Sequence, residues 1–443
     1  MADRSLKTLL VLSQVYPPDP ASVGQHMADA AEAMAGRGWR VVVFAADRGY
    51  DDPSVTYARS EQRNGVHVRR VPLSSFGKSS IVLRLLAGTI FMVQCIAGGL
   101  FVRRLAVILV STSPPMCSVA AMVIATVRRV PIKYWVMDLN PDQMIVLGRT
   151  TERSIPARVF NWINRRILSR AADVIVLDRF MAERLNRKRD VRSKQTLMPP
   201  WPHDDHLAVI DHADNPFRRE HDLDDRFVIM YSGNHGYSTP VTTVLKAALA
   251  LQDLRRLLFM FIGGGVGKKE VEQTIAEHAP RNIVSLPYQP LDRIKYSLSA
   301  ADVHLVSVGD PVVGVVHTCK VYGAMAVARP ILLLGPDPCH VSDLLGEHDL
   351  GWHISHGDVD AAVSTIRRIV ETPRSELLAM GRRGREVITT RLGKAALCGR
   401  FCDVLERGVR SPSSSTCSSR TIRSTCPRSS TATSGSTAIR RRV

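Results

Sequence analysis

Short apolar runs alternate with longer segments of helical spacing along most of the chain. Runs that are apolar almost throughout are typical of parallel strands buried on both faces, and helices between them complete a layered α/β domain. The predicted strands are Leu9–Leu12, Arg40–Ala45, Leu105–Val110, Ile132–Val136, Val174–Leu177, Phe227–Tyr231, Leu258–Ile262, Ile283–Ser285, Val303–Ser307 and Ile331–Leu334. The pattern occurs once in each half of the chain, so it predicts two Rossmann-like domains.

The run Pro199-Pro200-Trp201-Pro202 interrupts the pattern, because consecutive prolines cannot continue a helix or a central strand. It predicts an N-terminal domain over residues 1–203 and a C-terminal domain with a final helix over residues 204–409. Residues 410–443 are rich in Ser, Thr and Arg and contain no acidic residue. Such a composition cannot bury a core, so we expect a disordered tail.

One segment, Leu85–Val102, has 18 residues without a charge and is flanked by Arg84 and by Arg103-Arg104. That length is barely sufficient for a membrane span. Because the segment lies between two predicted strands of one sheet, a span would place those strands on opposite sides of the bilayer. We therefore expect a buried or partly interfacial helix.

The formal charge of +18 is distributed unevenly along the chain. Residues 1–200 carry +14, residues 201–409 carry −3 and residues 410–443 carry +7. The basic half indicates an anionic partner, and basic side chains beside the Leu85–Val102 segment favour peripheral attachment to an anionic membrane surface. No aromatic-interleaved basic motif is present, so nucleic acid is not an expected partner. The scattered cysteines fit a reduced, cytoplasmic compartment and no metal site.

Glycine-rich turns follow two neighbouring strands of the second half. Asn234 and Gly236 lie in the turn after Phe227–Tyr231, and Gly264 and Gly265 lie after the next strand. Turns of this kind at the carboxyl edge of a sheet expose backbone N–H groups that hold phosphate. Lys320 stands at a predicted helix start and is the only basic residue between Lys295 and Arg329, which favours a phosphate ligand.

On the N-terminal side, Asp138 follows an apolar strand at the edge that would face the second domain. A carboxylate there could accept a proton from an acceptor hydroxyl, and an aspartate that only caps the next turn is the alternative. His26 and His235 are weaker candidates for contact with substrate.

The order and spacing of several strings add a family resemblance. The strings YSGNHGYSTPVTTVLKAA, FIGGGVGKKEVE, LPYQPLDRIKYSLSAADVHLVSV and GVVHTCKVYGAMAVARP resemble the C-terminal half of a family-4-type glycosyltransferase with the GT-B fold. In the first half, SQVYPPDPASVGQHMADAAEAMAGRGWRVVVFAA, STSPP and VMDLNPD resemble its opening strand, first helix and later strand ends. The resemblance covers about residues 7–408 and is greatest to the bacterial subgroup that builds surface polysaccharide.

The resemblance implies two Rossmann-like domains that face each other across a cleft. It also implies a retaining transferase without a metal or other cofactor, which binds a nucleotide-sugar in the C-terminal domain and the acceptor in the N-terminal one. The acceptor would be a saccharide or a polyprenyl-diphosphate-linked sugar at the cytoplasmic face of the membrane. Lys320 would neutralise the leaving diphosphate, and Asp138 remains the candidate base. The implied donor-binding residues are Gly24, Asn234, His235, Gly236, Gly264, Gly265, Tyr288, Gln289, Gly314, Val315, Val316 and Tyr322.

In that set, the amides of Gly314 to Val316 would face the sugar and phosphate, Tyr288-Gln289 would frame the base, and Gly24 would close over the donor.

The chain departs from the family at several of these positions. Val315 and Gly323 occupy the places of two glutamates, and Thr112 that of a histidine. Two alternative functions therefore stay open. The first is a nucleotide-sugar epimerase of the same fold, which would need acid and base carboxylates near the donor, where residues 303–320 offer only Asp310. The second is a non-catalytic nucleotide-sugar-binding subunit.

Overall fold

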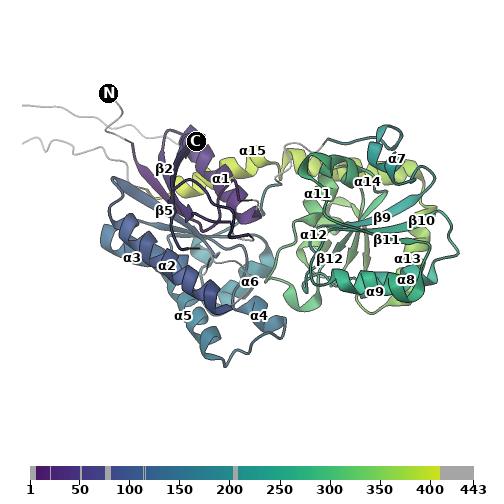
Figure 1. The fold of residues 1–443 in the computed structure, drawn as a ribbon, viewed down its shortest axis with the longest axis horizontal. Helices are drawn as coiled ribbons and strands as arrows, with labels where there is room; N and C mark the ends of the chain where they lie inside the picture. The colour runs from purple at the N-terminus through teal and green to yellow at the C-terminus, as the bar shows by residue number, and fades with distance from the viewer. Residues whose placement is uncertain are drawn as a thin grey trace, which may run out of the picture. The chain divides into compact units, whose positions relative to one another are not determined.

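The computed structural model describes residues 6–19, 21–49, 52–74, 81–112, 114, 116–202 and 208–409. The tail predicted for residues 410–443 lies outside these ranges. The described chain forms two β-sheets, each flanked by helices (Figure 1). This confirms the predicted α/β class with two Rossmann-like domains.

The first sheet has eight strands in the order β3-β4-β2-β1-β5-β6-β7-β8. All neighbours pair in parallel except β3 and β4, which are antiparallel. The strands are β1 (Thr8–Leu12), β2 (Arg40–Ala46), β3 (Ser60–Arg63), β4 (Val66–Val71), β5 (Leu105–Ser111), β6 (Ile132–Trp135), β7 (Asp173–Val176) and β8 (Gln195–Leu197). The accompanying helices are α1 (Ser22–Gly36), α2 (Ile81–Leu100), α3 (Cys117–Arg128), α4 (Asp142–Val146), α5 (Ile155–Arg170) and α6 (Arg179–Lys188).

The second sheet has six strands in the order β11-β10-β9-β12-β13-β14, all parallel. The strands are β9 (Phe227–Ser232), β10 (Leu257–Ile262), β11 (Ile283–Leu286), β12 (Val303–Ser307), β13 (Ile331–Leu334) and β14 (Gly351–Ile354). The helices are α7 (Pro216–Glu220), α8 (Thr242–Ala250), α9 (Lys268–His278), α10 (Ile294–Ser299), α11 (Lys320–Ala326), α12 (His340–His348), α13 (Val359–Glu371), α14 (Arg374–Thr390) and α15 (Lys394–Glu406).

All ten predicted strands are present, and the structure adds β3, β4, β8 and β14. The added strands lie at or next to the edges of the sheets, where one face or one side is open to water. The residues of β4 accordingly alternate between buried and exposed, and those of β14 are mostly half-buried. These four strands lack the continuous apolar runs by which the central strands were predicted.

Helix α2 confirms the helix expected for the Leu85–Val102 segment. None of the described helices is both long enough and apolar enough to cross a bilayer. Ala87, Phe91 and Cys95, spaced four residues apart, are buried against the core of the first domain. A Cβ atom at Gly99 would lie 2.4 Å from the Ile124 side chain, so this glycine allows α2 and α3 to pack closely.

The final helix, α15, packs with the first domain and not with the second, to which the sequence analysis assigned it. The Phe401 ring lies 4.3 Å from that of Trp135 and 5.6 Å from that of Trp201, between ring centroids. Leu397 and Leu405 are buried in the same core. The apolar spacing of residues 394–406 predicts a helix, but its partner is α1, far away in sequence (Figure 1). Local patterns carry no information on that choice.

A buried ion pair fastens the end of α15 to the first sheet. The Lys133 ammonium of β6 lies 2.6 Å from the Asp173 carboxylate of β7 and also donates to the carbonyl oxygen of Arg407 at 2.6 Å. The side chains of Lys133 and Asp173 are 0% and 6% exposed. Burial lowers the pKa of Lys133, and the carboxylate of Asp173 opposes this effect. A buried cation without its partner would be strongly destabilising.

We therefore expect Asp173→Ala to lower the free energy of unfolding by roughly 3–5 kcal/mol, measured by urea denaturation. Asp403→Ala is the matched control, because Asp403 also joins α15 to the first domain through an ion pair, with Arg37, but its side chain is 67% exposed. That change should cost less than about 1 kcal/mol. Equal losses for the two variants would contradict a special role for the buried pair.

Candidate functional site

Most of the predicted donor residues lie in loops that follow β9, β10, β11 and β12 at their carboxyl ends. From β9 the chain moves outward to β10 and β11, and it then returns to the other side of β9 to form β12. Sheets of this order bind ligands outside the carboxyl ends of the strands where the direction reverses. In the second domain this point lies between β9 and β12.

The two glycine-rich loops after β9 and β10 are joined by backbone hydrogen bonds. The Gly233 amide donates to Ile262 at 2.9 Å, and the His235 amide donates to Gly264 at 2.8 Å. Gly263 has a φ of +127°, and a Cβ atom there would lie 2.0 Å from the carbonyl oxygen of Gly233. Glycine is therefore required for the loops to approach each other so closely.

Several predicted donor residues meet at this contact. The side-chain amide of Asn234 packs against Gly265. A Cβ atom added at Gly265 would lie only 2.4 Å from the Oδ1 atom of Asn234. The Tyr288 hydroxyl donates to the carbonyl oxygen of Gly264 at 3.3 Å, and its ring is 58% exposed. An exposed aromatic face beside a glycine loop is suited to stacking with a nucleobase. Gln289, next to it, is half-buried.

Lys320, the first residue of α11, reaches the same loops. Its Cε would lie 3.0 Å from a Cβ atom at Gly233, and its ammonium lies 5.2 Å from the centre of the Tyr231 ring. Burial lowers its pKa to about 8. The structure thus places a partly desolvated cation beside Gly233 and Tyr231, at the start of the loop that carries Asn234 and Gly236.

Two further side chains, those of His235 and Lys268, stabilise these loops. His235 is buried between the rings of Tyr231 and Phe261, and burial, followed by the charges of Lys268 and Lys320, lowers its pKa to about 4. It is therefore neutral at physiological pH. The Lys268 ammonium donates to the carbonyl oxygen of Gly263 at 2.7 Å, and to that of Leu286. It thereby holds the ends of β10 and β11 together.

The expected role of Val315 and Val316 needs a correction. Their amides were predicted to face the sugar and phosphate, but both donate to the carbonyl oxygen of Val312, at 2.9 and 3.1 Å. A tight turn after residues 310–312 consumes these groups. The Val315 side chain is fully buried, and its carbonyl oxygen accepts a bond from the Leu139 amide at 3.1 Å. The segment therefore connects the two domains instead of offering N–H groups to a ligand.

Asp138 lies beside this connection. Its amide and that of Met137 donate to the Thr112 hydroxyl, each at 3.1 Å. Burial raises the pKa of Asp138 to about 6, and the nearby charge of His317 partly offsets this rise. The carboxyl group thus has a pKa suited to accepting a proton near neutral pH.

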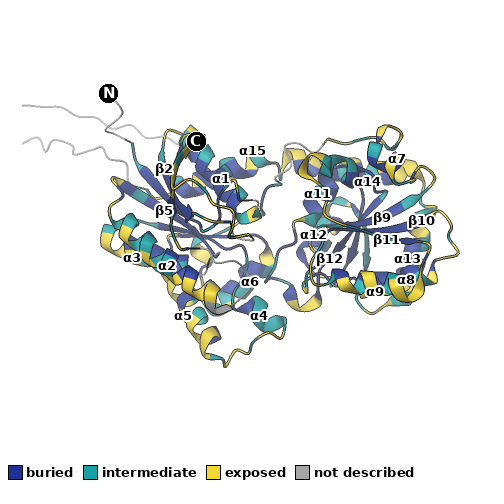
Figure 2. Ribbon diagram, in the orientation of Figure 1, coloured by how far each residue is buried: buried dark blue, intermediate teal, exposed yellow. Residues whose placement is uncertain are grey.

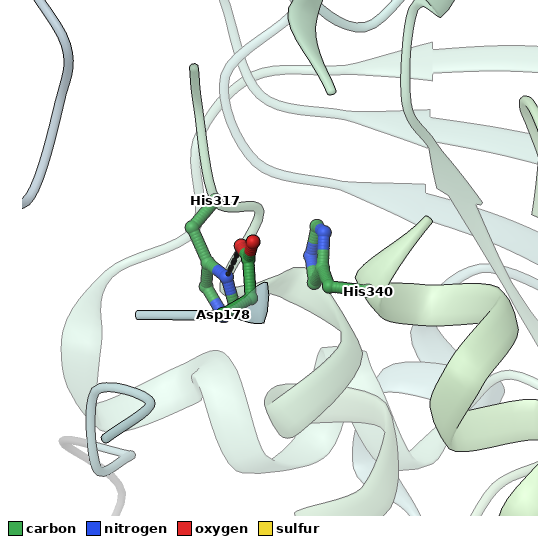
Figure 3. A group of neighbouring side chains, drawn as sticks. All are labelled: Asp178, His317 and His340. Carbon is green, nitrogen blue, oxygen red and sulfur yellow. Dashed lines mark hydrogen bonds and ion pairs between the residues drawn. The ribbon is translucent and has the colours of Figure 1, made fainter. Parts of the chain in front are cut away.

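Asp178, His317 and His340 form a buried group next to Asp138 (Figure 3). The Nδ1 atom of His317 donates to Asp178 at 2.7 Å, and its Nε2 atom lies 2.8 Å from the Tyr322 hydroxyl. Burial raises the pKa of Asp178, but the hydrogen bond and charge of His317 outweigh it, so this pKa lies below its usual value. Burial, followed by the charge of His317, lowers the pKa of His340 to about 3.

The donor atoms of these three residues lie within 4.8 Å of one another, close enough to be considered for a divalent cation. The two imidazole rings stack face to face, however, at 4.1 Å and 28°. Stacked rings direct their in-plane nitrogen lone pairs side by side and not toward one point. The Nδ1 atom of His317 also carries the proton that Asp178 accepts. The group therefore fits a hydrogen-bonded cluster better than a metal centre.

The structure explains two further candidates by packing. His26 is buried between Trp135 and Trp201, and its Nε2 atom donates to the carbonyl oxygen of Trp201 at 2.9 Å. It is a core residue. Gly24 lies in the first turn of α1, where a Cβ atom would come within 3.0 Å of the Val15 backbone. The close packing against Val15 therefore explains why a glycine occupies position 24.

Sequence reasoning missed Lys268, Asp178, His317 and His340. A signal existed for Lys268, which directly follows the glycine cluster, and for His317, three residues before Lys320. Asp178 and His317 are 139 residues apart, and nothing in the sequence indicates that they meet.

Comparison with known proteins finds relatives among glycosyltransferases. Residues 22–201 match the family model described as glycosyl transferase 4-like domain. WcaI of Escherichia coli K12, named as a colanic acid biosynthesis glycosyl transferase, is 23% identical over 383 residues, which cover 84% of this chain and 94% of WcaI. WbjE of Pseudomonas aeruginosa, named as a glycosyltransferase, is 24% identical over 246 residues, 55% of this chain and 61% of WbjE.

Solved structures share the fold over most of the chain. Sucrose-phosphate synthase from Thermosynechococcus elongatus has a TM-score of 0.69 at 16% identity, over 90% of this chain and 98% of that one. HepE from Anabaena, solved with UDP-glucose, has a TM-score of 0.66 at 13% identity, over 90% and 99%. WaaG, a glycosyltransferase involved in lipopolysaccharide biosynthesis, has 0.63 at 13%, over 90% and 100%.

Proposed function

We propose that this chain, a family-4-type glycosyltransferase with the GT-B fold, moves a sugar from a nucleotide-sugar to a saccharide or lipid-linked acceptor in the synthesis of surface polysaccharide. The observation that carries the proposal is the contact of Lys320 with Gly233, which itself contacts Gly263, at the switch point of the second sheet. A cation beside two glycine loops is suited to a diphosphate.

The proposed chemistry divides between the two domains. Lys320 stabilises the negative charge that develops on the departing diphosphate, a role that a metal would otherwise fill. We propose that the reaction proceeds with retention and without a metal. Asp138 accepts the proton of the acceptor hydroxyl, since its raised pKa matches that task.

The acceptor side suggests attachment to the cytoplasmic face of the membrane. Helix α2 packs on α3, and α3 packs on α5. These helices carry exposed residues on their outer faces, which we call the α2–α3–α5 face (Figure 2). Its exposed apolar residues are Leu83, Leu85, Leu86, Val93, Val123, Val127, Ile155, Val159 and Trp162, with Phe101 directly after α2.

Exposed arginines accompany the α2–α3–α5 face, including Arg129, Arg165 and Arg166. Each basic residue near an anionic leaflet contributes about 1 kcal/mol of attraction. Two other basic residues, Arg184 and Lys188, instead pair with Asp142, so they contribute less to such attraction. A lipid-diphosphate acceptor would be reached from this surface.

The first test is a thermal-shift screen of the full chain with UDP, GDP, ADP and their sugars. One nucleotide series should raise the melting temperature, because binding to the folded state stabilises it by about 2.7 kcal/mol at 100 times Kd. Lys320→Met should weaken binding of the diphosphate roughly 10- to 100-fold. Lys269→Met, an exposed neighbour of the same loops, is the control and should bind normally. Absence of any shift would remove the support for a transferase, and binding without turnover on any acceptor would favour a non-catalytic subunit.

The pH dependence of kcat/KM provides a second test. Asp138 must be ionised to accept a proton, so activity should fall as the pH drops below about 6. Lys320 must be protonated, so activity should also fall as the pH rises above about 8. Asp138→Asn should reduce turnover at least ~100-fold while the melting temperature is kept. Near-normal turnover in this variant would exclude Asp138 as the base.

Sedimentation with liposomes tests the membrane proposal. The chain should bind vesicles containing anionic lipid, and salt should weaken that binding. Phe101→Asp should reduce it, because this side chain is 84% exposed next to α2. Leu291→Asp, at a residue 82% exposed in the second domain, is the matched control and should have no effect. Vesicle binding that does not change with anionic lipid content, with salt or with the Phe101→Asp substitution would contradict the proposed surface.

A further inference from the structure

The segment from Gly314 to Thr318 connects the donor site with the acceptor side through several contacts. The Val315 carbonyl oxygen accepts from the Leu139 amide at 3.1 Å. A Cβ atom at Gly314, whose φ is +71°, would lie 2.6 Å from the carbonyl oxygen of Phe180. The Thr318 carbonyl oxygen accepts from the His340 ring at 3.3 Å. The segment therefore touches Leu139 and the start of α6 in the first domain at one end, and α12 at the other.

The strongest of these contacts is the buried bond between His317 and Asp178. Their side chains are only 2% and 8% exposed. Asp178 also caps α6, because its other oxygen accepts from the Met181 amide at 2.8 Å. A carboxylate can only accept, so the Nδ1 atom of His317 carries a proton whether the ring is neutral or charged. The Tyr322 hydroxyl can donate to Nε2 in the neutral ring or accept from it in the charged one.

We propose that His317, fixed by Asp178 and Tyr322, is a positioning residue of the transfer reaction that holds Lys320 of the donor site in register with Asp138 of the acceptor side. The inference rests on the proposed function. Lys320 is three residues after His317, and Leu139, bonded to Val315, directly follows Asp138. One hydrogen-bonded chain thus ties both reacting groups to a common anchor.

The glycine loops after β9 and β10 are held by bonds of their own and by Lys268, and the described contacts of Asp178 and His317 do not include them. Loss of the tether should therefore leave Lys320 beside Gly233 at the glycine loops, so the nucleotide still binds, but change the position of Asp138 relative to Lys320. Small misplacements of catalytic groups reduce turnover by up to about 100-fold. Such a split between kcat and donor affinity distinguishes positioning from a merely structural role.

The test compares Asp178→Asn and Tyr322→Phe with the unsubstituted chain. Asparagine caps helices as well as aspartate does, so Asp178→Asn keeps the cap of α6 but removes the charge that holds His317. In hydrogen–deuterium exchange, the peptide covering residues 314–320 should exchange at least ~10-fold faster in both variants, and the glycine-loop peptides should be unchanged. On whichever nucleotide-sugar of the UDP, GDP and ADP panel is turned over, kcat should fall roughly 10- to 100-fold with donor KM within about 3-fold.

Asp343→Asn is the matched control. It removes an ion pair with Arg179, the residue after Asp178, that also joins the two domains but is half-exposed. It should change neither exchange nor kcat. Unchanged exchange in Asp178→Asn, or an equal loss of kcat in Asp343→Asn, would overturn the proposal. If the unsubstituted chain turns over no donor, the proposed function fails, whereas nitrogen-15 NMR of the His317 ring still shows whether Asp178 holds its Nδ1 proton.

Discussion

The close approach of two glycine loops determines the architecture of the proposed donor site. Gly233 and Gly263 lie in backbone contact because neither has a Cβ atom, and their φ angles of +126° and +127° are unfavourable for other residues. This contact brings the ends of β9 and β10 together and leaves a path along which the Lys320 side chain reaches them. Around this backbone lie the side chains of Asn234, Tyr288 and Lys268.

The sequence predicted those parts of the fold and site that depend on local patterns. Central strands are apolar on both faces, so they appear as continuous runs, and the loops at their carboxyl ends must share one edge of the sheet. On that basis the loops of Asn234 and Gly264 could be predicted to lie side by side, and the structure joins them by backbone hydrogen bonds. The hydrogen bonds of Val315 and Val316 could not be predicted. Both amides donate to the carbonyl oxygen of Val312 within a tight turn, and no sequence pattern indicates that turn. Asp178 and His317 meet across 139 residues, with no pattern that links them.

Charge is used sparingly at the site. Lys320 is the cation placed at the donor loops, and burial weakens its hold on its proton, with a pKa of about 8. His235 beside it is neutral, because burial lowers its pKa to about 4. The hydrogen-bonded pair of Asp178 and His317 lies instead at the contact with the first domain. The glycine loops thus have the ammonium groups of Lys320 and Lys268 beside them, and the buried pair lies elsewhere.

The position of α15 has a consequence for how the protein is made. The core of the first domain includes Phe401, and the cation of Lys133 is satisfied in part by the carbonyl oxygen of Arg407. During synthesis the ribosome releases the first domain long before these residues exist. That domain must therefore wait, with Trp135 and Trp201 uncovered, until the second domain has been translated. Premature termination before residue 394 would damage the beginning of the protein rather than its end, and the uncovered aromatic surface is where a chaperone would bind the nascent chain.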